Sequence, residues 1–214
     1  MPKKKIQEFF PVKDKQNQPA VKIKFKKTDQ THFTLGTRAY PENHKNRFAL
    51  ALLSVILGGN MSSRLFIEVR EKLGLAYYVK TEVEAYADCG YLATQVGVEH
   101  KNLELAIKTI LQEYQKIASL KVGKKELQKA KDFIKGKSLM GLEASDEVAM
   151  FFASQEIKKK KILTPSEIFT KIDKVTPFDI LKVAQEIFSK KRLNLAIIGP
   201  HKNAPKIKTI LNLG

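Results

Sequence analysis

Cysteine is almost absent from this chain: its 214 residues include one, Cys89. A single thiol cannot form an intramolecular disulfide, and it is too few to hold a cysteine-ligated zinc or iron–sulfur cluster. We therefore expect a protein of a reducing compartment, or one whose fold is indifferent to redox conditions.

Long apolar runs are also missing. The longest, Phe48 to Leu57, is interrupted by Ser54 and falls well short of the roughly 20 residues that a membrane-spanning helix needs. The basic start of the chain resembles the beginning of a signal peptide, but Gln7, Glu8 and Pro11 interrupt the apolar stretch that should follow. These features predict a chain without a membrane span that acts in the cytoplasm.

Arginine is scarce although the chain is strongly basic. The formal net charge is +17, yet only five of the 39 basic residues are arginines. Proteins that read nucleic-acid bases favour the planar fork of arginine, and the lysines here are scattered, with Lys158 to Lys161 as the one block of four. This composition argues against nucleic-acid binding as the primary role, despite the attraction of any basic surface for phosphate.

Known metal and nucleotide motifs are lacking as well. The four histidines are far apart, and neither H-E-x-x-H nor H-x-x-E-H occurs, so we expect no zinc bound by this chain alone. The glycine pair Gly58-Gly59 lacks the lysine of a phosphate-binding loop, and a sharp turn between helices explains it more simply.

Apolar material is plentiful, at 43% of residues, which excludes global disorder and suffices for a core. Its periodicity predicts an order of strands, helices and a hairpin that is typical of an α+β fold, a mostly antiparallel sheet covered by helices. Residues 1–19, with three prolines, indicate a linker, so a single domain is expected over 20–214. The predicted strands lie at 21–25, 31–35, 75–85, 91–98 and 192–198, and the predicted helices at 44–57, 60–73, 103–117, 124–140, 144–158, two short ones after the caps Thr164 and Thr176, and 204–213.

Two polar side chains stand out at one junction of these elements. Arg70 falls in the last turn of the second predicted helix, Gly74 ends that helix, and Tyr77 begins the next strand. Both side chains can therefore point to one sheet edge, where a charged and a phenolic donor would stabilise an oxyanion. The alternative is a structural role, with Arg70 paired to Glu71 or Asp88 and Tyr77 packed on the sheet.

The stretch from Ile56 to Tyr77, ILGGNMSSRLFIEVREKLGLAY, resembles the pitrilysin and mitochondrial-processing-peptidase family of zinc metallopeptidases, the inverzincins. Further similar segments follow the family's order: QTHF at 30–33, YADCG at 86–90, and 163–177 with its two Thr-Pro steps. The resemblance covers residues 20 to 200, nearly the whole chain.

The resemblance implies a fold and a role. Family members contain two similar α+β halves that close like a clamshell on an unfolded peptide, and only the N-terminal half carries H-x-x-E-H and zinc. This chain resembles the C-terminal half alone. Arg70 and Tyr77 match the family's arginine and tyrosine that reach the substrate carbonyl near the metal, and the substrate-binding set becomes Gly58, Gly59, Arg70 and Tyr77. The long glycine-rich loop of non-catalytic processing-peptidase subunits is absent here.

We therefore expect the non-zinc half of a metallopeptidase, inactive as an isolated chain. It would bind extended peptide along a sheet edge and assist hydrolysis by a zinc-bearing partner half, in the same polypeptide, in a separate subunit or through a homodimer. The alternatives are a non-proteolytic scaffold subunit of the same fold and a basic nucleic-acid-binding module. No cofactor is expected on this chain, and zinc is expected in the partner half.

Overall fold

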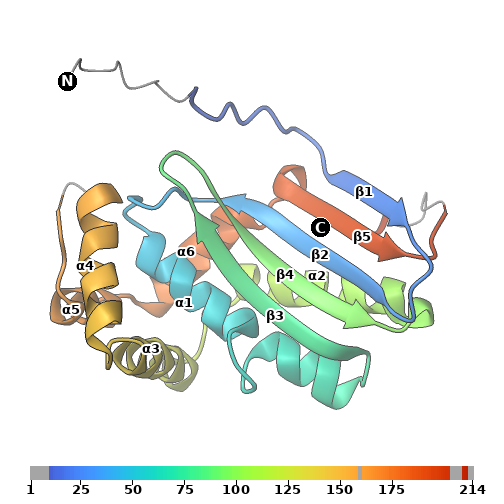
Figure 1. The fold of residues 1–214 in the computed structure, drawn as a ribbon. Helices are drawn as coiled ribbons and strands as arrows, with labels where there is room; N and C mark the ends of the chain where they lie inside the picture. The colour runs from blue at the N-terminus through green and yellow to red at the C-terminus, as the bar shows by residue number, and fades with distance from the viewer. Residues whose placement is uncertain (1–9, 159–160, 203–208, 212–214) are drawn as a thin grey trace.

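A five-stranded sheet forms the centre of the computed structural model, which describes residues 10–158, 161–202 and 209–211. The strand order is β1-β5-β2-β4-β3, and all neighbours are antiparallel except β1 and β5, which are parallel. The predicted α+β class, a mostly antiparallel sheet covered by helices, is confirmed (Figure 1). The strands are β1 (Ala20–Phe25), β2 (Thr31–Ala39), β3 (Ala76–Ala85), β4 (Gly90–Val98) and β5 (Leu193–Gly199).

The helices fall into two groups. The helices α1, α2 and α6 lie against one face of the sheet, whereas α3, α4 and α5 gather beyond β3 (Figure 1). Within the described residues, every helix falls short of the length and apolarity that a membrane span requires. The bounds are α1 (Arg47–Gly58), the π-helix η1 (Phe66–Lys72), the short 3-10 helix η2 (His100–Asn102), α2 (Leu103–Ser119), α3 (Lys124–Met140), α4 (Ser145–Lys158), α5 (Pro165–Asp173), α6 (Pro177–Ile187) and the 3-10 helix η3 (Lys190–Arg192).

The core lies between the sheet and the first helix group. Alternate residues of β2, such as Phe33 and Leu35, are buried on the helix side because side chains of a strand alternate between its two faces. Helix α1 is apolar around most of its circumference and is correspondingly buried, with Leu52, Leu53 and Leu57 fully inaccessible. This packing fixes α1 beneath β3, the strand that carries Tyr77.

Local sequence signals explain most element ends. Thr164 and Thr176 each form a complete capping box with the acid three residues later, so α5 and α6 begin at the predicted positions. The strand predicted at 31–35 continues to Ala39, and the helix predicted from residue 60 begins later, as a π-helix. The predicted terminal helix at 204–213 lies mostly outside the described residues.

The described part of the N-terminal segment, residues 10–19, contacts the sheet without being part of it. The Gln16 side chain donates a hydrogen bond to the Leu193 carbonyl at 2.9 Å and accepts one from Arg38 at 3.0 Å. Strand β1 then starts at Ala20. The division into a linker over 1–19 and a domain over 20–214 remains a prediction.

Candidate functional site

Arg70 lies on the π-helix η1, in its last turn. The hydrogen bonds of this π-helix join residues five apart, where those of an α-helix join residues four apart. The Leu73 N–H, for example, donates to the Glu68 carbonyl at 3.3 Å. Val69 is fully buried while Arg70 is exposed, and its guanidinium carbon lies 4.9 Å above the centre of the Phe66 ring. Arg70 therefore faces solvent, supported from one side by an aromatic ring.

Arg70 forms no ion pair with any residue that the structure describes. Of the two acids considered as structural partners, Asp88 instead accepts a hydrogen bond from the Val12 N–H at 2.7 Å, and Glu71 makes no ion pair with Arg70. The positive charge of Arg70 is consequently available to a ligand.

Tyr77 follows directly on a tight reversal of the chain. Gly74 adopts φ +58°, a conformation that favours glycine, and the Leu75 N–H closes the helix end by donating to the Val69 carbonyl at 2.9 Å. The pairing of β3 with β4 then skips one residue between Ala76 and Tyr78, so Tyr77 occupies a β-bulge. This local change of register leaves Tyr77 60% exposed.

The hydroxyl of Tyr77 has no hydrogen-bond partner among the described residues, unlike that of its neighbour. The Tyr78 hydroxyl lies within hydrogen-bond distance of Nδ1 of His32, at 3.2 Å. The Tyr78 ring covers Gly97 so closely that a Cβ on Gly97 would lie 2.7 Å from a ring carbon. Tyr78 thus packs on the sheet while Tyr77 does not. The two donors singled out from the sequence, Arg70 and Tyr77, are both exposed and both available.

The glycine pair has a structural explanation in this fold. Gly58 is buried where α1 crosses β3, and a Cβ on it would lie 2.4 Å from Oγ1 and 2.7 Å from the backbone nitrogen of Thr81. Gly59 is half-buried, follows the last residue of α1 and lines a cavity beside β3. Close packing of helix on strand therefore accounts for Gly58. Close approach to α1 accounts for Gly59, where a Cβ would lie 2.6 Å from the Cα of Val55.

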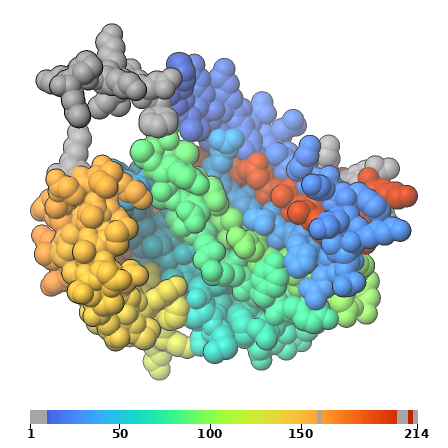
Figure 2. Space-filling view, viewed as in Figure 1, coloured from blue at the N-terminus to red at the C-terminus, as the bar shows by residue number. Residues whose placement is uncertain are grey.

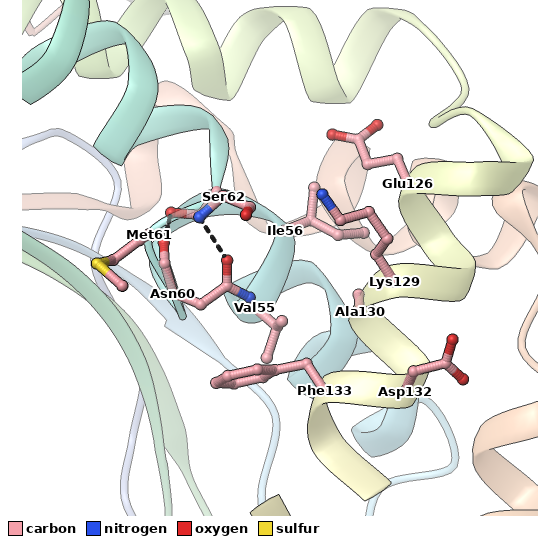
Figure 3. A pocket seen from close by; sticks show the side chains of 11 residues that line it. Val55, Ile56, Asn60, Met61, Ser62, Glu126, Lys129, Ala130, Asp132 and Phe133 are labelled. Atoms are coloured by element: carbon pink, nitrogen blue, oxygen red, sulfur yellow. Dashed lines mark hydrogen bonds between the residues drawn. The ribbon is translucent and has the colours of Figure 1, made fainter. Parts of the chain in front are cut away.

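Two cavities flank α3 and share the residues Val55 and Phe133. One of about 500 Å³ lies along β3, and one of about 570 Å³ lies beside the turn that follows α1. In the second, the side chains of α1 and α3 face each other across the hollow, and the Asn60 side chain accepts a hydrogen bond from the Ser62 N–H at 2.9 Å (Figure 3). Sequence reasoning missed the α3 residues; the only signal was apolar Phe133 and Ile134 in a lysine-rich helix.

An ion pair joins the start of the chain segment that carries Arg70 to α3. Nε and Nη2 of Arg64 donate to the two carboxylate oxygens of Glu126 at 2.7 and 2.8 Å. These bonds lower the pKa of Glu126 and raise that of Arg64. The bidentate contact fixes the position of α3 relative to η1.

Metal-binding groups are not assembled in the described residues. Within residues 10–158, 161–202 and 209–211, no three side chains of histidine, cysteine, aspartate or glutamate lie close enough to hold a metal ion. His100 and His201 do approach each other, but both bond to the buried Thr31 hydroxyl, at 2.8 and 2.7 Å. These residues do not fit a catalytic zinc.

Comparison with known proteins gives consistent similarities in sequence. Residues 2–134 match the family model described as the peptidase M16 inactive domain. Uncharacterized zinc proteases of Rickettsia felis, Streptomyces coelicolor and Bacillus subtilis are 37%, 32% and 32% identical to this chain, over 82%, 83% and 84% of it. The chain spans only 42%, 39% and 44% of those proteins.

Solved structures show the same fold. A protease from Helicobacter pylori superposes with a TM-score of 0.83 at 22% identity, covering 94% of this chain and 49% of that one. A peptidase M16 inactive domain from Pseudomonas fluorescens gives 0.81 at 17% identity, over 92% and 47%. Complex III2 from Candida albicans contains a chain that gives 0.77 at 13% identity, over 96% and 53%.

Proposed function

Because the chain belongs to the M16 peptidase family and carries its inactive domain, we propose that it assists peptide hydrolysis by a zinc-bearing half. The relatives, about twice its length, support a second half, supplied by the same polypeptide, by a separate subunit or within a homodimer. In this proposal the metal belongs to that half and this chain supplies substrate contacts.

The exposure of Arg70 and Tyr77 carries the proposal, together with the lack of an ion pair to Arg70 and of a hydrogen bond to the Tyr77 hydroxyl among the described residues. When a peptide bond is attacked, negative charge develops on the carbonyl oxygen, and fixed donors aimed at that oxygen lower the barrier. Arg70 offers a charged N–H donor and Tyr77 a phenolic O–H donor. The Phe66 ring restrains the Arg70 side chain before substrate arrives, which favours a donor that needs little reorganisation.

The test is a peptidase assay of this chain reconstituted with its zinc-bearing half. Arg70→Ala and Tyr77→Phe should each lower kcat by about 100-fold, because each removes a transition-state donor, and should change KM less. Lys72→Ala on the same helix and Tyr78→Phe on the same strand are matched controls, and we expect both to stay within about twofold of the unaltered chain.

Equal activity of Arg70→Ala and its Lys72→Ala control would contradict the assisting role. The second candidate, a scaffold without proteolysis, would then be favoured, as the occurrence of this fold in Complex III2 illustrates. A complex that forms normally but shows no chelator-sensitive cleavage at all would support that candidate directly.

A further inference from the structure

Helix α4 carries apolar side chains on two opposite faces. Its inner face is partly or fully buried and holds Val148, Phe151, Phe152 and Gln155. The Gln155 amide donates to the Leu163 carbonyl and accepts from the Leu163 N–H, both at 3.0 Å, which ties this face to the segment after the helix. The inner face of α4 therefore has its partners within the chain.

The outer face of α4 is apolar as well. It holds Met150, Ala153 and Ile157 at intervals of three and four residues, and Met150 and Ile157 are 62% and 85% exposed. Surface helices normally place polar side chains there, as α2 does with Glu104 and Lys108. Figure 2 shows the orange surface of α4 uncovered on the side that faces the viewer. An apolar stripe of this spacing is the seam by which one helix packs on another.

One flank of this stripe is acidic at its start and basic at its end. Glu147 and Lys158 are three helical turns apart, so both lie on the same flank, about 16 Å from each other. Neither forms an ion pair with any described residue. A helix that runs in the opposite direction and carries the same two charges would place its lysine beside Glu147 and its glutamate beside Lys158. The charge pattern of α4 is therefore complementary to α4 of a second copy.

Two-fold symmetry brings the apolar and the charged groups into register together. With the axis midway along the outer stripe, Met150 of one copy faces Ile157 of the other. Such an axis turns the same flank of both helices toward each other, so Glu147 of each copy faces Lys158 of the other. On the opposite flank the one charged side chain is Glu156, which does not face its own copy across the axis. A parallel pair would instead set the flank of Glu147 against the flank of Glu156.

We propose that two copies of this chain associate through α4 as an antiparallel helix pair. This association joins two halves without zinc, so it is distinct from the pairing with a zinc-bearing half and does not depend on it. Figure 1 shows α4 at the left end of the molecule, whereas β3 begins at the lower right beside the teal helix η1, so the pair leaves Arg70 and Tyr77 uncovered. Two helices of 14 residues bury less area than a standard interface, and we expect a Kd on the order of 10 µM.

Sedimentation equilibrium of the 214-residue chain tests the association directly. Between about 1 and about 300 µM the average mass should rise from that of a monomer toward that of a dimer, and a chain that stays monomeric would overturn the proposal. Ile157→Asn should weaken the dimer by more than about tenfold, because each copy loses an apolar contact. Leu105→Asn on α2 is the matched control, since Leu105 is also exposed, at 49%, and should stay within about twofold. Equal effects of the two substitutions would overturn the assignment to α4.

Charge reversal tests the antiparallel geometry. Glu147→Lys and Lys158→Glu should each weaken self-association by about tenfold, because each turns two attractive pairs into repulsive ones. A mixture of the two variants should associate again, since both opposite-charge pairs are restored between unlike copies. Glu104→Lys on α2 makes the same charge change outside the interface and should have a much smaller effect. A mixture that associates no better than its components, or an equal effect of Glu104→Lys and Glu147→Lys, would overturn the antiparallel pair.

The two proposals fail in different ways. Arg70→Ala should leave self-association unchanged while it lowers kcat of the reconstituted enzyme, and Ile157→Asn should do the reverse. The same sedimentation experiment with the zinc-bearing half bound should show an assembly that contains two copies of this chain. An assembly with one copy, in which the zinc-bearing half covers α4 instead, would overturn the helix pair and leave the assisting role intact.

Discussion

Replacing Gly58 by alanine separates packing from ligand contact at this position. A Cβ there would lie 2.4 Å from Oγ1, 2.7 Å from the nitrogen and 2.8 Å from Cβ of Thr81. Ordinary contacts begin near 3.4 Å, so α1 and β3 would have to separate by about 1 Å, and overpacking of this kind costs about 1–3 kcal/mol. Alanine recovers a fraction of this through its better helix propensity, at most about 1 kcal/mol.

The expected net loss is about 1–2 kcal/mol in the free energy of unfolding, or about 2–8 °C in Tm for a domain of this size. The displacement would also reach the buried chain of hydroxyls in which Thr81 bonds to Thr94 at 2.8 Å and Thr94 to Tyr114 at 2.6 Å. Urea unfolding followed by circular dichroism measures the loss.

Gly136 supplies the matched control, because it lies inside α3 and a Cβ there would meet nothing within 4 Å. Gly136→Ala should therefore stabilise the protein by up to about 1 kcal/mol. If Gly58→Ala were as stable as the unaltered chain but lowered the activity of the reconstituted peptidase, the packing explanation would be refuted and the predicted substrate contact of Gly58 supported.

Two further predictions concern pH. Burial and the neighbouring His100 lower the pKa of His201, so on acidification the unfolded chain binds a proton at His201 before the folded chain does. The urea midpoint of unfolding should therefore fall as the pH is lowered from 7.5 to 5.5, and it should fall less in the His201→Gln variant. An equal fall in the variant and the unaltered chain would contradict this role of His201. The Arg64 contact lowers the pKa of Glu126, so Glu126→Gln should cost about 1 kcal/mol at pH 7 and progressively less as the pH falls below the ordinary pKa of glutamate. A difference in stability that does not decrease with acidification would exclude the ion pair as its cause.

Local patterns in the sequence predicted much of the fold because they act through neighbouring residues. The capping boxes at Thr164 and Thr176 need only three residues each, and Gly74 ends its helix through its own φ. The parallel pairing of β1 with β5 was not predictable in this way, since it joins residues such as Val21 and Leu195 from opposite ends of the chain.

The candidate site was also predictable only in its local features. Residue types and the spacing of Arg70 and Tyr77 predicted two donors beside one sheet edge, and the family resemblance implied a role for them that stays a prediction. Whether the donors were already paired could not be read from the sequence, because a surface arginine finds its partners in three dimensions. The structure shows Arg70 over Phe66 and without an ion pair among the described residues.

The sequence by itself determined most element types, the α+β class and the absence of a zinc motif, because each depends on residues close together in the chain. Only the tertiary structure decided that Tyr77 lies in a β-bulge, that Gly58 is enclosed by Thr81, and that β3 and α3 border a groove. Those features arise where residues 51–59, 80–83 and 133–138 meet, and packing between distant segments leaves no local pattern in the chain.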